Sequence, residues 1–209
     1  MKSPVEYIKE AWAIYTKKEN FIFFAKIMAV LVIVSTVNGY IFSYLRINNN
    51  DYLSIISLII LVIFGVWIQS TTYFSILKIG ANEREIFKLG YINMGKFFLV
   101  SLVVGLIVAF GAILLVIPAI IFGVWYSFST FLVLDKNLGI KMALKTSKAM
   151  VYGKFWKLFG RFIVFGLFIF IISLSLAIIP YVGPLIVSFV APLFILPYFL
   201  LYRDLSGAV

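Results

Sequence analysis

The chain has 209 residues, of which 64% are hydrophobic and 12% charged, and its mean hydropathy is +1.12. Soluble domains average about 45–50% apolar and about 25% charged residues, so this is the composition of a membrane protein. There are 18 basic and 8 acidic residues, a formal net charge of +10, and neither His nor Cys. The commonest general base, the commonest transition-metal ligand and all thiolate chemistry are therefore excluded. We expect no enzyme, and no catalytic, cofactor-binding or metal-ligating residues.

Four long apolar runs predict six membrane-spanning helices. A helix needs about 20 apolar residues to cross about 30 Å of hydrocarbon. The runs 27–45 and 52–77 each provide one span. The runs 97–134 and 162–202 are too long for one span, and each contains a helix-breaking signal, Pro118 in the first and PYVGP at 180–184 in the second. We therefore expect an all-α, polytopic fold with six helices in three hairpins, forming a single membrane domain over 1–209.

The basic residues lie almost entirely on one side of this predicted topology. Seventeen of the 18 Lys and Arg residues fall in the termini and loops of one side, and Arg46 alone falls on the other. Loops rich in Lys and Arg stay in the cytoplasm. We therefore expect a multi-pass protein of the cell (inner) membrane with both termini cytoplasmic.

A short amphipathic segment precedes each predicted hairpin. In the first, the sequence SPVE at 3–6 is typical of a helix capping box and is followed by apolar residues at helical spacing. Segments 82–94 and 140–152 repeat the pattern, and each ends in a similar junction, GKFF at 95–98 and GKFW at 153–156. We expect all three segments to be helices lying on the cytoplasmic interface. They divide the chain into repeat-like units of about 3–80, 81–138 and 139–205.

The stretch 117–160 resembles a known membrane family. It contains a helix-breaking proline in IPAI at 117–120, the turn DKNLG at 135–139, ALKTS at 143–147 and GKFW at 153–156. In this order the motifs are similar to the membrane domain of some glycerophosphoryl diester phosphodiesterases and of related bacterial integral membrane proteins. Ala119 and Asn137 stand where that family often has glycine. The resemblance implies a membrane-embedded module linked to lipids or envelope upkeep. It does not imply the phosphodiesterase activity, which belongs to a separate soluble domain with its own acidic and histidine residues.

A basic stripe follows the third amphipathic segment into the next span. Its first three members are spaced i, i+4 and i+7, and the whole set is Lys141, Lys145, Lys148, Lys154, Lys157 and Arg161. Each such charge contributes about 1 kcal/mol near an anionic leaflet, so these residues are candidate contacts for anionic headgroups. The alternative is that they only fix the topology. We expect no nucleic-acid binding, because the charge lies within a few residues of the bilayer.

The predicted spans carry no ionisable residue near their centres, which argues against a proton-coupled pump. A candidate polar patch at membrane depth contains Asn38, Gln69, Ser70, Thr71 and Thr72. Such side chains either contact a substrate or form interhelical hydrogen bonds. Gly105 with Ala109, and Gly123 with Ser127, form small-xxx-small pairs that predict close helix packing.

These features predict a non-enzymatic membrane protein, without a cofactor, that binds membrane lipids or a protein partner in membrane or envelope maintenance. A second copy of the chain would serve as such a partner. The alternative is a small transporter or permease subunit for an apolar or amphiphilic solute, which would need a polar-lined cavity near Gln69. A third hypothesis is an accessory or immunity-type protein that works through a partner.

Overall fold

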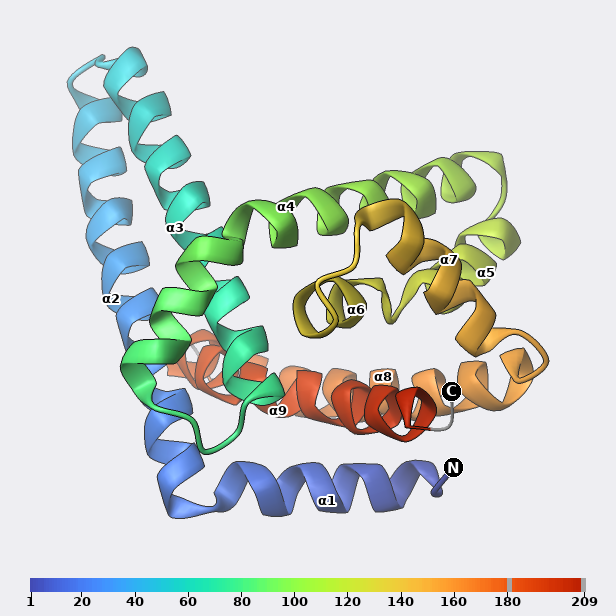
Figure 1. The fold of residues 1–209 in the computed structure, drawn as a ribbon. Helices are drawn as coiled ribbons and strands as arrows, with labels where there is room; N and C mark the ends of the chain where they lie inside the picture. The colour runs from blue at the N-terminus through green and yellow to red at the C-terminus, as the bar shows by residue number, and fades with distance from the viewer. Residues whose placement is uncertain (180–181, 208–209) are drawn as a thin grey trace.

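The computed structural model describes residues 1–179 and 182–207, which form nine helices and no strand (Figure 1). The helices are α1 (Pro4–Thr16), α2 (Lys18–Ile47), α3 (Asp51–Leu77), α4 (Glu83–Leu114), α5 (Val116–Tyr126), α6 (Ser129–Asp135), α7 (Ile140–Val151), α8 (Phe155–Ala177) and α9 (Val182–Ser206). Six segments are long and apolar enough to cross a membrane, with α5 and α6 together forming one of them. The prediction of an all-helical protein with six potential spans is confirmed.

The third apolar run breaks at Leu115, three residues before the predicted position. Leu115 is extended, with φ −173° and ψ 157°, and separates α4 from α5. A proline lacks an N–H and clashes with the carbonyl four residues earlier, so the preceding helix must end before Pro118. Pro118 itself occupies the first turn of α5, where backbone N–H groups have no partner within the helix. Of the predicted turn at 180–184, the first two residues lie outside the described ranges, and α9 begins at Val182.

The predicted second amphipathic helix is not a separate element. Residues 83–94 form the first part of α4, which continues through the GKFF junction to Leu114. Figure 1 shows that α4 changes direction along its length without a break in the ribbon. At the matching GKFW junction, Gly153 has φ +74° and separates α7 from α8. Glycine permits a left-handed turn without requiring one, so the same motif gives two different outcomes.

The short helix α1 begins as the sequence predicts. The Ser3 hydroxyl accepts the backbone N–H of Glu6 at 3.3 Å, and the Glu6 carboxylate accepts the backbone N–H of Ser3 at 2.8 Å. This reciprocal pair confirms the capping box. The Ser3 bonds also lower the pKa of the Glu6 carboxyl, because they favour its ionised form.

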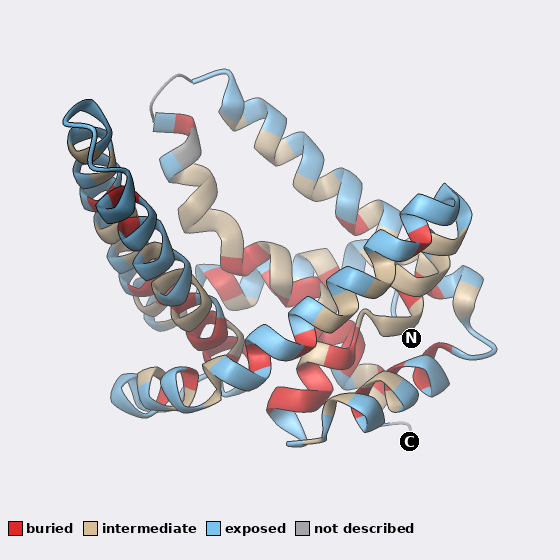
Figure 2. Ribbon diagram, turned by 90° about the horizontal axis from the view of Figure 1, so that it is seen from above, coloured by how far each residue is buried: buried red, intermediate tan, exposed pale blue. Residues whose placement is uncertain are grey.

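The buried core lies where α1, α6 and α7 meet α8 and α9. Its largest fully buried aromatic side chains include Tyr7, Phe128 and Phe165. The C-terminal part of α2 and the N-terminal part of α3 instead extend away from the other helices as an exposed arm, the α2–α3 arm, which Figure 2 shows mostly in pale blue with a few buried residues along it. Tyr52, near the tip of that arm, is 86% exposed. Because hydrocarbon can surround such apolar side chains as well as protein can, this arm suits a lipid environment.

Candidate functional site

Five of the six candidate lipid contacts are exposed and form what we call the basic surface: Lys141, Lys145, Lys148, Lys154 and Lys157. None of the five forms a salt bridge with any residue that the structure describes. The cause lies in the sequence, because residues 136–203 contain six Lys and two Arg but no Asp or Glu. Carboxylates elsewhere in the chain pair with other basic residues. Glu83 pairs with Lys26 at 2.9 Å, and Glu85 pairs with Lys78 at 3.0 Å.

The sixth candidate, Arg161, has a structural role. Its Nη2 and Nε donate to the backbone carbonyl of Lys2 at 2.7 and 3.2 Å, and its Nη1 donates to the carbonyl of Lys157 at 2.8 Å. Three of the five guanidinium donors are therefore engaged within the protein. Arg161 holds the start of the chain against α8, so we leave it out of the basic surface.

An aromatic cleft of about 350 Å³ lies beside the basic surface, between α5 and the link from α7 to α8. Its lining residues are Ile121, Trp125, Val151, Tyr152, Gly153, Phe155 and Trp156. The Lys148 ammonium lies 4.0 Å from the ring centre of Trp125, within cation–π range. Tyr152 and Trp156 are 82% and 78% exposed. Since Trp and Tyr favour the membrane–water boundary, the cleft suits the depth of lipid headgroups.

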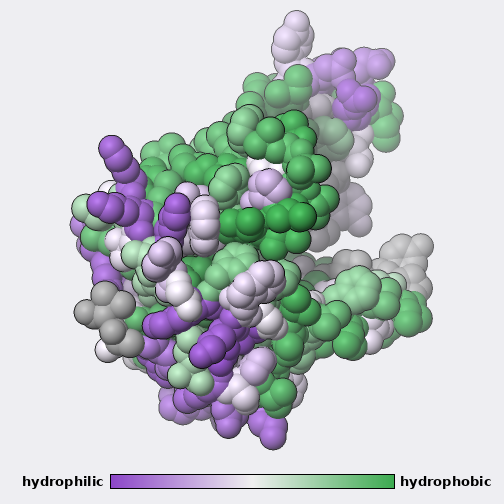
Figure 3. Space-filling model, turned by 90° about the vertical axis from the view of Figure 1, so that its right-hand side faces the viewer, coloured by the Kyte–Doolittle hydropathy of each residue, from purple (hydrophilic) through white to green (hydrophobic). Residues whose placement is uncertain are grey.

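Hydropathy is unevenly distributed over the molecular surface. In Figure 3, hydrophilic side chains gather at the lower left of the visible face, and hydrophobic side chains cover much of the remainder. A smaller hydrophilic group lies at the far top. The tip of the α2–α3 arm is polar, with Arg46 paired to Asp51 at 2.9 Å. Polar ends separated by an apolar middle are what a spanning arm requires.

A hydrogen bond and a salt bridge link helix α1 to the end of α9. The Tyr7 hydroxyl donates to the Asp204 carboxylate at 2.7 Å and accepts the backbone N–H of Lys2 at 3.2 Å. Glu10 of α1 also pairs with Arg203 at 3.0 Å. Burial and the bond to Asp204 together raise the pKa of Tyr7 to about 12.

The candidate polar patch does not form a single site. Asn38 is buried, and its Nδ2 donates to the carbonyl of Ser57 at 2.9 Å, linking α2 to α3. Ser57 precedes Gln69 by twelve residues on α3, which is about 18 Å along a helix. The hydroxyls of Thr71 and Thr72 donate to carbonyls four residues earlier in their own helix, at 2.8 and 2.9 Å. Three of the five side chains therefore satisfy their hydrogen bonds within the protein.

The other two patch residues differ. Ser70 is fully buried, and its hydroxyl has no partner among the described residues. Gln69 is exposed and lines two clefts. One of about 350 Å³ lies between α3 and α4, and its lining includes Val62, Gly65, Val66, Gln69, Phe97, Phe98 and Ser101. The other, of about 200 Å³, lies among α2, α3 and α9, and is lined by Met28, Leu31, Ile68, Gln69, Thr72, Ala191 and Ile195.

Comparison of the chain with protein-family models, curated proteins and solved structures finds no match in any of the three.

Sequence reasoning missed the cleft residues contributed by other elements. Trp125 lies 23 residues before Lys148, and Phe98 lies 36 residues after Val62. No periodicity within one helix reports contacts at such separations. The one local signal for the aromatic cleft was the junction between segment 140–152 and GKFW at 153–156, which contains Tyr152 and Trp156.

Proposed function

We propose that the protein is a non-enzymatic lipid-binding module of the inner membrane, and that the basic surface binds anionic headgroups of the cytoplasmic leaflet. The observation that carries the proposal is five exposed lysines, unpaired with any described carboxylate, beside an aromatic cleft. Each lysine near an anionic leaflet contributes about 1 kcal/mol. The cleft would receive the glycerol and upper acyl region of the same lipid, and the module would serve membrane or envelope maintenance.

The proposed placement in the membrane follows from the charge distribution. The three hairpins would be α2 with α3, α4 with α5–α6, and α8 with α9. Helices α1 and α7, and the first part of α4, would lie along the cytoplasmic interface. Both termini would then be cytoplasmic, and seventeen of the 18 basic residues would face the anionic leaflet.

The test measures headgroup binding on protein reconstituted in phosphatidylcholine nanodiscs. In a background with Trp12 and Trp67 replaced by Phe, energy transfer from Trp125 and Trp156 to a dansyl-labelled phosphatidylglycerol reports how strongly that lipid is enriched beside the cleft. Substituting Lys141, Lys145 and Lys148 together by Gln should weaken binding at least tenfold, because about three charge contributions are lost. Substituting the same three by Arg should preserve it.

The matched control removes the same net charge elsewhere. Lys9, Lys18 and Lys136 are also exposed, and substituting all three by Gln should change binding less than twofold. An equal loss in both triple variants would show that net charge alone attracts the lipid. That result would refute the proposed site.

Transport of an amphiphilic solute is a second candidate, favoured by the exposed position of Gln69 between two clefts. Its test is the rate at which a fluorescent lipid crosses the bilayer of proteoliposomes, compared with protein-free vesicles. Equal rates would eliminate transport of that class of solute.

A further inference from the structure

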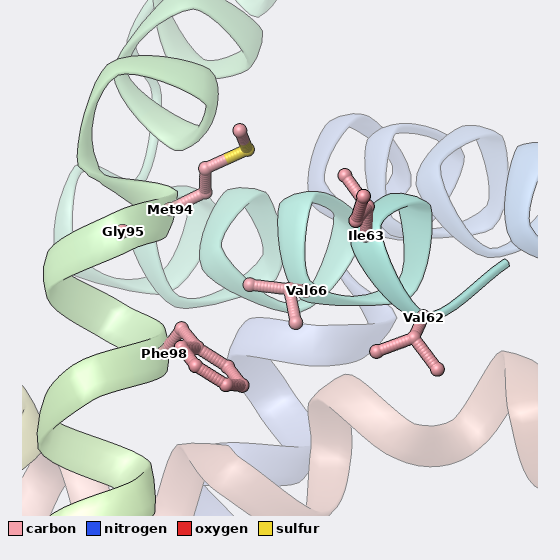
Figure 4. A pocket seen from close by; sticks show the side chains of 6 residues that line it. All are labelled: Val62, Ile63, Val66, Met94, Gly95 and Phe98. Atoms are coloured by element: carbon pink, nitrogen blue, oxygen red, sulfur yellow. The ribbon is translucent and has the colours of Figure 1, made fainter. Parts of the chain in front are cut away.

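A groove open to the surface runs between α3 and α4. It consists of two overlapping clefts, of about 240 and 350 Å³, that share Val62, Val66 and Phe98. Figure 4 shows the valines on α3 and Phe98 on α4, with Met94 above them. We call this space the α3–α4 groove. Its larger cleft has the volume of an ordinary small-molecule site.

Two polar side chains in the groove lack hydrogen-bond partners. Gln69 of α3 and Ser101 of α4 are both exposed, and neither bonds to any residue in the described ranges. Several other hydroxyl groups in the spans bond to their own helix, as Ser175 does to the carbonyl of Ile171 at 2.8 Å. The groove therefore presents an unsatisfied amide and hydroxyl together.

The apolar surroundings of Gln69 make this arrangement costly without a ligand. Gln69 lies within the charge-free run 52–77, and the groove around it is lined mainly by apolar side chains. An unsatisfied polar group in hydrocarbon is unfavourable, because no water is present to bond to it. A molecule that places hydrogen-bonding atoms in the groove would remove this cost.

The lining specifies the chemistry of that molecule. None of the described residues that line either cleft of the groove is charged, so a charged headgroup would be desolvated there without a counter-ion. A primary amide both donates and accepts hydrogen bonds, which complements a hydroxyl group. The apolar walls complement an acyl chain. We propose that the α3–α4 groove binds an uncharged lipid that carries a free hydroxyl, of the diacylglycerol type, with the hydroxyl at Gln69 and Ser101 and a chain along Val62, Val66 and Phe98.

This groove is separate from the basic surface, because the two share no residue. The proposal stands whether or not the basic surface binds anionic lipid. Substituting Lys141, Lys145 and Lys148 by Gln should therefore leave binding in the groove unchanged.

The experiment uses the full chain in phosphatidylcholine nanodiscs and a dioleoylglycerol analogue with a photoreactive group in one acyl chain. We expect labelling of peptides from α3 and α4, and competition by unlabelled dioleoylglycerol. Gln69→Leu should weaken binding about threefold to tenfold, which corresponds to one neutral hydrogen bond. Val66→Trp, which fills the groove, should abolish specific labelling. Ser175→Ala, on exposed α8, is the matched control and should have no effect.

A second probe tests the hydroxyl itself. Acetylation of the lipid hydroxyl removes its donor, so wild-type protein should prefer the free hydroxyl and Gln69→Leu should lose that preference. The proposal is overturned if Gln69→Leu binds both probes as the wild type does, or if labelling maps outside α3 and α4. It is also overturned if bifunctional crosslinking through position 69 joins two copies of the chain, because the groove would then be a protein interface.

Discussion

The Ser147 hydroxyl on α7 donates a hydrogen bond to the backbone carbonyl of Trp125, at 2.7 Å, where α5 ends. The same oxygen accepts the backbone N–H of Phe128 at 3.2 Å. Ser147 is fully buried and bridges the interruption between α5 and α6. Buried backbone groups must be paired, so a side chain from a neighbouring helix completes this span. The bond also fixes α7, and with it Lys148, against the aromatic cleft.

Ser147→Ala should destabilise the protein, because it leaves the Trp125 carbonyl and the Phe128 N–H buried without this partner. The expected loss in the free energy of unfolding is about 1–3 kcal/mol. It can be measured by titrating the protein with sodium dodecyl sulfate in mixed micelles and following its circular dichroism. Ser127→Ala is the control, since the one bond of that hydroxyl within the described residues is to the carbonyl of Val124 in its own turn. Equal stability of the two variants would show that the bridge contributes nothing measurable.

Gly90→Ala should separate α3 from the first part of α4. A Cβ at this position would lie 2.8 Å from the Cα of Thr71, and backbone cannot yield as a flexible side chain does. We expect a loss of about 1–3 kcal/mol, measured by the same titration. Gly105→Ala is the control, because no described atom apart from the adjacent backbone of α4 and its chain neighbours lies within 4 Å of its Cβ position. Alanine there should be neutral or stabilise α4 by up to about 1 kcal/mol. A larger loss of stability for Gly105→Ala than for Gly90→Ala would contradict the observed packing.

These glycines show where prediction from the sequence reached its limit. The apolar runs and Pro118 predicted the spans because length and hydropathy act locally along the chain. The small-xxx-small spacing at Gly105 and Gly123 predicted close packing, yet no described residue of another helix lies within 4 Å of either Cβ position. Close approach occurs instead at Gly90, through a partner on another helix that no local pattern identifies.

In the candidate site, too, local spacing predicted some features and contacts between helices determined the others. The spacing of the lysines predicted a shared exposed face on α7, and Lys141, Lys145 and Lys148 are all exposed. The predicted polar patch grouped Asn38 with Gln69 because both are polar residues within predicted spans. In the structure, Asn38 bonds to Ser57, which is far from Gln69 along α3. Which residues pair between helices depends on the tertiary arrangement, so the composition of the spans could not predict these pairs.

Tyr7→Phe should loosen α1 by removing the bond to Asp204. In the wild type, the pKa of Tyr7 rises from 10.0 to about 12 on folding. The neutral phenol is therefore favoured in the folded state, and its stabilisation is complete below pH 10 and lost as the pH rises from 10 to 12. A nitroxide on Val5→Cys reports the mobility of α1, and the chain has no other cysteine. Mobility should rise over that pH range in the wild type.

In Tyr7→Phe the label should already be more mobile at pH 8, and the rise from pH 10 to 12 should be smaller. Burial also raises the pKa of Tyr15, but Tyr15 is present in both proteins, so their difference isolates Tyr7. Identical pH profiles would mean that the hydroxyl of Tyr7 does not hold α1 in place.

The proposed topology predicts opposite accessibility for the two ends of the α2–α3 arm. Asn48 at its tip and Lys136 after α6 are both exposed, and single cysteines at these positions can be labelled without background because the chain has no cysteine. A membrane-impermeant maleimide should label Asn48→Cys on intact spheroplasts and Lys136→Cys only after permeabilisation. The reason is that seventeen of 18 basic residues resist translocation on one side. Labelling of both positions from outside would require an even number of spans between them, in place of the proposed three. The reversed pattern would place the basic surface away from the anionic leaflet, and either result would remove the basis for headgroup binding.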